Sequence, residues 1–107
     1  MENTYIIVLA TTNSKQEAEN IAQKLLEQKL IACANIVGPI SSHFHWDGKV
    51  EQAEEFLVLM KSRSDLFEEI SETVGKLHSY EVPEIIALPI MAGSKAYLDW
   101  LGTSLQP

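Results

Sequence analysis

The chain reads Trp46-Asp47-Gly48-Lys49 near its middle, and residues that favour strands flank this tetrapeptide on both sides. An Asp-Gly pair between such runs is the strongest short-range signal of a β-hairpin, because a two-residue type I′ turn needs positive φ at both central positions. The predicted hairpin spans 31–61 of the 107 residues. Its arms exceed the usual strand of about five or six residues, so we expect them to project beyond the core.

A length of 107 residues suits a single domain, 1–107, with one core. No apolar run approaches the roughly 20 residues of a membrane span, so no membrane partner is expected. The short apolar run Tyr5–Ala10 follows no basic segment, which predicts a protein without a signal peptide that stays in the cytoplasm. The single cysteine, Cys33, cannot form an internal disulfide and is consistent with a reducing compartment.

The formal net charge is -7, and Arg63 is the only arginine. A surface that tracks nucleic-acid phosphates needs clustered positive charge, so no nucleic-acid partner is expected. Metal cations or cationic partners suit this balance better, although most acidic side chains in such a protein simply face solvent.

Hydrophobic periodicity predicts the order strand, helix, strand, strand, helix, strand and terminal helix. The predicted elements are a strand over 5–10, a helix with a capping box at Ser14 and Glu17 that stops near Lys29, strands over 31–37 and 50–61, a helix capped by Ser62 and Asp65, a strand over 84–88 and a helix from Ser94. Gly38-Pro39 interrupts the second strand and predicts a bulge or bend.

This order is the α+β, ferredoxin-like split-βαβ arrangement, a four-stranded antiparallel sheet with two helices on one face. The other sheet face stays uncovered. A monomer would expose an apolar patch larger than the few hundred Å² usually tolerated, so we expect association through the sheet faces and the projecting hairpins.

Cys33 lies between Ala32 and Ala34 on a predicted core strand. A buried thiol is most often a small hydrophobe, because burial raises its pKa and makes it inert. A nucleophilic role needs a base within reach, and the sequence places none of the three histidines beside it.

His43 and His45 share one face of the hairpin, where Gln52 and Glu54 lie close in the predicted register. Two imidazoles at i and i+2 of a strand, with a carboxylate nearby, can chelate a divalent cation of the copper or zinc type. An oligomer interface or a solvated ribbon explains the same residues.

The densest polar run, His78-Ser79-Tyr80-Glu81-Val82-Pro83-Glu84, lies between a helix end and a core strand. A histidine there interacts well with the helix dipole, so helix capping alone explains it. The nitrogen and oxygen atoms of His78, Tyr80, Glu81 and Glu84 suit binding of a metal ion or a small polar ligand about as well as they suit a purely structural role in the loop.

Three segments together resemble the CutA family, the divalent-cation tolerance proteins. They are Lys29–Ile36, Trp46–Glu51 with Glu55 and Lys61, and His78–Ile86 continuing through Pro89 and Gly93 to Leu101. Three ordered motifs over nearly the whole chain are highly specific. The resemblance implies a homotrimer whose long hairpins embrace neighbouring subunits, polar clefts between them, and a role in tolerance of copper or another divalent cation.

The resemblance also implies functional positions in this chain. The cleft residues of the family correspond to Cys33, Asn35, Trp46, Lys49, Glu51, Glu55, Lys61, Tyr80 and Glu81, with His78 and Glu84 as the expected metal ligands. Some bacterial members bind copper through a cysteine and two adjacent histidines, whose positions hold Ala10 and Leu77-His78 here, so only His78 corresponds. Cu(II) or another divalent cation is the expected ion, and no organic cofactor is predicted.

Two other functions compete with metal tolerance. A small-ligand sensor or interaction scaffold would use the same intersubunit cleft without metal. Acylphosphatase-like catalysis, which this fold also supports, needs an arginine in a phosphate-binding loop, whereas Arg63 precedes the second helix. We therefore predict that the protein is not an enzyme, and fold alone does not decide the matter.

Overall fold

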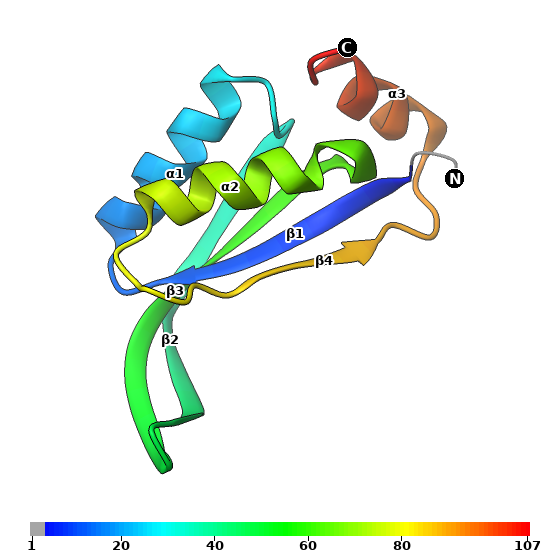
Figure 1. Ribbon diagram of the computed structural model, residues 1–107. Coiled ribbons are helices and arrows are strands. Elements are labelled where there is room, and N and C mark those ends of the chain that lie inside the picture. Colours follow the sequence, from blue (N-terminus) through cyan, green and yellow to red (C-terminus); the bar gives the residue numbers. More distant parts are fainter. Residues whose placement is uncertain (1–3) are drawn as a thin grey trace.

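A computed structural model describes residues 4–107, in which a four-stranded antiparallel sheet carries two helices on one face (Figure 1). The elements are β1 (Tyr5–Thr12), α1 (Lys15–Glu27), β2 (Cys33–Trp46), β3 (Lys49–Arg63), the 3₁₀ turn η1 (Ser64–Leu66), α2 (Phe67–Leu77), β4 (Ile85–Pro89) and α3 (Lys95–Thr103). The strand order is β2-β3-β1-β4, which confirms the predicted ferredoxin-like arrangement. None of the helices in the described part of the chain has the length and apolarity needed to cross a membrane.

The hairpin forms in the predicted register. Asp47 and Gly48 have φ values of 52° and 76°, and Trp46 pairs with Lys49. The register shifts between Val37 and Ile40, at the predicted bulge.

The outer half of the hairpin projects from the body of the protein (Figure 1). The molecule measures 44 × 26 × 24 Å, and its radius of gyration is 14.4 Å. A compact domain of this length has a radius of about 13 Å. The projecting arm accounts for this difference, because it extends away from the core and lengthens the molecule along one axis (Figure 1).

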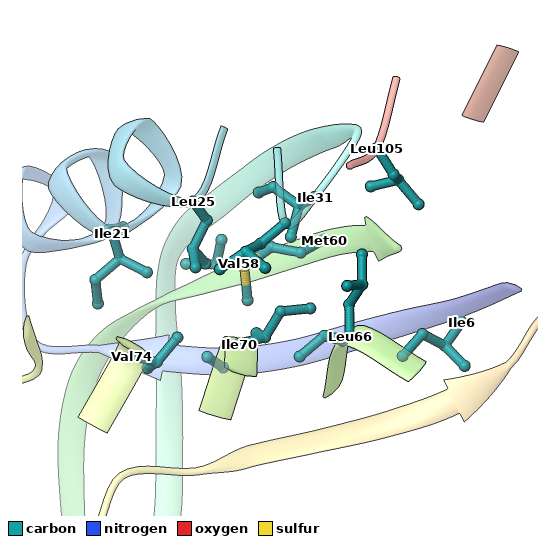
Figure 2. Packing of buried hydrophobic residues seen from close by; sticks show 14 of the residues in the cluster. Ile6, Ile21, Leu25, Ile31, Val58, Met60, Leu66, Ile70, Val74 and Leu105 are labelled. Carbon is teal, nitrogen blue, oxygen red and sulfur yellow. The ribbon is translucent and has the colours of Figure 1, made fainter. Parts of the chain in front are cut away.

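The core lies between the two helices and the sheet (Figure 2). Val58 and Met60 of β3 meet Ile21 of α1 and Ile70 of α2, and all four side chains are fully buried. Burying an aliphatic side chain of this size contributes about 1.5–3 kcal/mol relative to leaving it exposed. Buried and less buried side chains alternate along β1 and along the part of β3 that pairs with it, and the buried ones face the helices.

The second helix does not begin at the predicted cap. Ser62 belongs to β3, where it pairs with Ile6, and its hydroxyl donates a hydrogen bond of 2.6 Å to the Leu30 carbonyl oxygen. The ladder with β1 extends β3 to Arg63, so the chain turns through η1 before α2 starts. The Ser62 and Asp65 prediction was wrong because the spacing of a capping motif does not reveal how far a strand ladder continues.

The second strand also starts later than predicted. β2 begins at Cys33, and the preceding Leu30 and Ile31 are buried in the core instead. Lys29 has a φ of 56° and ends α1 in a Schellman motif, in which the Leu30 N–H bonds to the Leu25 carbonyl oxygen at 3.0 Å.

The sheet face opposite the helices is open, as the sequence predicts. Ile7 and Leu9 of β1 point to this face and are half-buried. Val37, Ile86 and Leu88 also lie on it and are 46%, 49% and 51% exposed. The central strand β1 is therefore covered by the chain's own helices on one face only.

Candidate functional site

A cavity of about 680 Å³ lies between the outer half of the hairpin and the loop that precedes β4. Its volume falls within the range of about 300–1,000 Å³ that is typical of small-molecule sites. The lining residues are Thr11, Ser42, His43, Phe44, Trp46, Glu51, Gln52, Glu55, Tyr80, Glu81, Val82 and Glu84.

The projecting part of β3 forms the first wall of this cavity. β3 pairs with β1 from Phe56 to Arg63. On the hairpin-tip side of Phe56, β3 pairs with β2 alone. Glu55 follows toward the hairpin tip and pairs with Ile40, immediately beyond the register shift. Glu51 lies four residues from Glu55 and so points to the same face of the strand. The projecting arm thus presents two carboxylates to one side.

Glu55 is the most buried carboxylate of the site, with 6% of its surface exposed. The Tyr80 hydroxyl donates a hydrogen bond of 2.7 Å to Glu55 Oε2. Burial, and then the hydrogen bond to Glu55 and its charge, raise the pKa of Tyr80 to about 12. The phenol therefore stays protonated at neutral pH and remains a donor to the carboxylate.

His78 lies behind the cavity wall, with a fully buried side chain. Its Nε2–H donates to the Thr11 carbonyl oxygen at 2.7 Å, and its Nδ1 accepts from the Tyr80 N–H at 3.0 Å. This pattern assigns the neutral tautomer with the proton on Nε2. Both ring nitrogens are thereby occupied, so His78 holds Tyr80 in place and, in this conformation, offers no nitrogen to a metal ion.

Glu17 anchors the same loop from the first turn of α1. Its carboxylate accepts hydrogen bonds from the Ser79 N–H at 2.5 Å and from the Ser79 hydroxyl at 3.0 Å. Only half of the predicted capping box forms, because the Ser14 hydroxyl caps the Glu17 N–H while the Glu17 side chain turns to the loop instead. The motif thus joins α1 to the cavity wall.

Glu84, the second predicted metal ligand, lines the cavity without a formed metal centre around it. Within residues 4–107, no three side chains of the His, Cys, Asp or Glu type lie close enough together to hold an ion. Ala10 and Leu77 offer no ligand atoms at the positions that the resemblance indicated. One chain therefore supplies oxygen donors suited to divalent cations but not the converging set that a metal site requires.

The predicted histidine pair has the expected register. His43 lies opposite Gln52, while Glu54 lies one step along the same face, opposite Ser41. The His43 Nε2 lies 3.1 Å from the Ser41 hydroxyl oxygen, in a hydrogen bond. His43 lines the cavity, whereas His45 and Glu54 do not.

A second polar group lies at the opposite end of the open sheet face. The Lys61 ammonium donates to Asn35 Oδ1 at 2.6 Å, and Cys33 is paired with Lys61 across the strands. The Cys33 sulfur lies 3.6 Å from the Tyr97 hydroxyl, and this hydrogen bond raises the pKa of Tyr97. Cys33 is half-buried on the open face, not in the core as predicted.

The predicted cleft residues thus lie in three separate places within one chain. Trp46, Glu51, Glu55, Tyr80, Glu81 and Glu84 line the cavity, whereas Cys33, Asn35 and Lys61 lie apart and Lys49 occupies the hairpin tip. Sequence reasoning missed Thr11, Ser42 and Phe44 as lining residues. The hairpin register places Phe44 opposite Glu51, whereas Thr11 borders the cavity because the loop packs against it.

The sequence pattern of the family described as "CutA1 divalent ion tolerance protein" matches residues 6–104. A "Divalent-cation tolerance protein CutA" of Archaeoglobus fulgidus is 46% identical over 99 residues, which cover 92% of this chain and 96% of that protein. "Protein CutA, chloroplastic" of Arabidopsis thaliana is 42% identical over 92% of this chain and 54% of its own length. The solved "Divalent cation tolerance protein (Cut A1)" of Thermus thermophilus superposes with a TM-score of 0.93 at 42% identity, covering 95% of this chain and 99% of that one.

Proposed function

Because the chain belongs to the CutA1 divalent ion tolerance family, we propose that it acts in tolerance of divalent cations, Cu(II) among them, as a cytoplasmic homotrimer. The family match over residues 6–104 is the observation that carries this proposal. We further propose that the acidic cavity is where the cation binds, weakly and with help from a neighbouring subunit.

The open sheet face supports the proposed assembly. Its exposed Ile86 and Leu88, together with Val50 on the hairpin, leave apolar surface in contact with water. Trp46 is also 55% exposed near the hairpin tip. Large aromatic and aliphatic side chains exposed together mark an interaction surface. Packing of these surfaces against neighbouring copies would bury them.

Four carboxylates in one cavity support the proposed cation binding. Glu51, Glu55, Glu81 and Glu84 line it, and no lysine or arginine is found among its described lining residues. Low-dielectric walls strengthen the attraction of such a cavity for cations. Since these carboxylates do not converge, ligands from a second copy would have to complete a metal centre.

Equilibrium dialysis against Cu²⁺, Zn²⁺ and Mn²⁺, combined with sedimentation, tests both parts of this proposal. We expect a species of about three times the 12.0-kDa chain mass that retains a divalent ion, with weaker binding after Glu84→Gln. The matched control is Glu68→Gln on the exposed face of α2, which should leave binding unchanged. A folded species with the mass of one chain, or dialysis without bound ion, would contradict the corresponding part.

The same experiment distinguishes a structural role of His78 in the loop from a role as a metal ligand. Because both of its ring nitrogens are hydrogen-bonded within the chain, we expect His78→Gln to alter the loop and the stability more than the number of bound ions. Loss of one ion per chain with unchanged stability would instead identify His78 as a ligand.

A second candidate function is small-ligand sensing through the same cavity. Its volume of about 680 Å³ exceeds the space that a single ion occupies, and its aromatic residues Phe44 and Trp46 supply no ligand atoms for a metal ion. A rise in melting temperature with a metabolite, in protein freed of metal, would favour this function, since a ligand that binds only the native state stabilises that state.

A further inference from the structure

The three histidines of the chain differ in how far their ring nitrogens are occupied. His78 is buried, and both of its nitrogens are hydrogen-bonded to the backbone. His43 uses Nε2 for the hydrogen bond to Ser41, and its Nδ1 has no partner within residues 4–107. His45 has no hydrogen bond or ion pair in the same part of the chain, and both side chains are exposed. His43 and His45 are therefore the histidines whose nitrogens are accessible to a ligand.

His43 and His45 have the spacing of a chelating pair. They lie two residues apart on β2, in the part of the hairpin that projects from the body of the protein (Figure 1). Such residues point to the same face of a strand, with Cα atoms roughly 6.5–7 Å apart. A bond from an imidazole nitrogen to a metal ion is about 2.0–2.1 Å long. Both rings can therefore lean toward one ion held above the strand between them, and no packed core restricts their rotation.

The neighbouring residues of β3 favour a cation at this position. Gln52 is paired with His43, and Glu54 lies one step along the same face, opposite Ser41. Diagonal neighbours across two strands are about 7–8 Å apart, which is within reach of long side chains. The β3 partners of residues 41–45 include no lysine or arginine. A cation bound to the imidazoles is thus attracted by Glu54 and meets no positive side chain among these partners.

The donor atoms of the pair indicate which ion it binds. Imidazole nitrogen suits copper, zinc and nickel, whereas magnesium, calcium and manganese prefer oxygen. Among the divalent ions of the first transition row, affinity is highest for Cu²⁺, and mixed nitrogen and oxygen donors suit its tetragonal geometry. No three side chains of the His, Cys, Asp or Glu type converge within residues 4–107, so water has to fill the positions that the two imidazoles leave.

We propose that His43 and His45 chelate Cu²⁺ on the exposed hairpin, with one nitrogen from each ring and with water or Glu54 as the further ligand. This site goes beyond the proposed function, because the carboxylates of the acidic cavity take no part in it, although His43 also borders that cavity. Both imidazoles come from one chain, so the chelate does not require a neighbouring copy.

Electron paramagnetic resonance of the protein with one equivalent of Cu²⁺ per chain, combined with equilibrium dialysis, tests this site. We expect nitrogen couplings from two imidazoles in the spectrum. His45→Ala should remove one of them and weaken Cu²⁺ retention by at least about tenfold, since losing even an outer partner of a metal ligand costs about 10–100-fold. Retention of Mn²⁺ should not change, because this ion prefers oxygen donors.

Two further substitutions in the His45→Ala background separate chelation from the number of histidines. Ser41→His places a second imidazole two residues from His43 on the same face of β2, so it should restore both the retention and the second nitrogen coupling. Gln28→His restores the number of histidines at an exposed position at the end of α1 and should restore neither. Equal Cu²⁺ retention by the two double variants would overturn the proposal.

The outcomes for this pair and for the acidic cavity are distinguishable. Cu²⁺ retention that falls with Glu84→Gln but not with His45→Ala would overturn the chelate and leave the proposed cavity site intact. The reverse result would support the chelate and remove the cavity from Cu²⁺ binding. If a neighbouring copy packs on this face and covers the rings, the Cu²⁺ spectrum would lack both imidazole couplings and His45→Ala would lower the mass in sedimentation, which also overturns the chelate.

Discussion

Glu17 and Ser79 are joined by two hydrogen bonds, although 62 positions separate them in the chain. The contact ties the first turn of α1 to the loop that carries Tyr80 and Glu81 into the cavity wall. Glu17 Oε1 also lies 3.4 Å from the Nδ1 of the buried His78. A residue whose spacing predicts helix capping thus serves mainly to position the candidate site.

Glu17→Ala tests this contact. The substitution removes the acceptor of both Ser79 hydrogen bonds, one of them from the backbone, so we expect the free energy of unfolding to fall by about 1–3 kcal/mol. Guanidinium unfolding at fixed protein concentration measures the change. Glu19→Ala, an exposed position in the same helix, is the control and should change stability by less than about 0.5 kcal/mol. Equal effects of the two variants would show that the loop contact contributes nothing beyond helix formation.

Tyrosinate absorbance measures the environment of Tyr80. Because its pKa is about 12, we expect a titration step near pH 12 that disappears in Tyr80→Phe. Glu55→Gln should move the step to lower pH, since burial remains while the hydrogen bond to the carboxylate and its charge are lost. A Tyr97→Phe background avoids overlap, because Cys33 also raises the pKa of Tyr97.

The same raised pKa fixes the direction of the stability change at high pH. The folded state favours the neutral phenol, so the contribution of Tyr80 is complete below 10.0, the ordinary pKa of a tyrosine, and is lost as pH rises toward about 12. Wild-type stability should therefore decrease over this interval more steeply than that of Tyr80→Phe. Parallel pH profiles for the two proteins would contradict the assignment.

Gly48→Ala tests the turn at the hairpin tip. A Cβ at this position would meet no atom within 4 Å, so any loss of stability comes from the φ of 76° and not from a clash. We expect the free energy of unfolding to fall by about 1–2 kcal/mol, which is the strain of an L-residue in the left-handed region. Asp47→Asn is the control and should be nearly neutral, because asparagine tolerates a φ of 52° as well as aspartate does.

Gly38 and Gly75 should respond to alanine in opposite directions. A Cβ on Gly38 would lie 2.5 Å from Cδ2 of the Phe56 ring, so overpacking should lower stability by about 1–3 kcal/mol. Gly75 is exposed in α2 with open space around its Cα, and alanine there should raise stability by about 0.4–1 kcal/mol. Chemical unfolding of the two single variants checks both signs.

Leu88→Lys tests whether the open sheet face is an interface. Leu88 is 51% exposed in the single chain, so lysine should fold normally within one subunit. If copies pack on this face, the charge would be buried and the assembly would dissociate, which sedimentation would detect. Leu26→Lys on α1 starts from a similar exposure of 40% and should leave the assembly intact. An unchanged mass for Leu88→Lys would place the interface elsewhere.

The sequence by itself determined the hairpin, the order of the elements and the family. Asp47-Gly48 specifies its own turn because positive φ is a local property of two residues, and side-chain alternation then sets which residues face each other. The apolar stripes of α1 and α2 likewise follow from periodicity alone.

Only the tertiary structure decided where the polar groups meet. Ser62 continues a strand because β1 extends the ladder, and Glu17 turns from its own helix to Ser79 because the packed loop brings two donors within its reach. Both ring nitrogens of His78 form hydrogen bonds, one to the Thr11 carbonyl oxygen and one to the Tyr80 N–H, and no spacing rule predicts these partners. Local conformation depends on neighbours in sequence, whereas hydrogen-bond partners depend on which distant segments the core brings together. The positions of the residues that line the cavity follow from these long-range contacts.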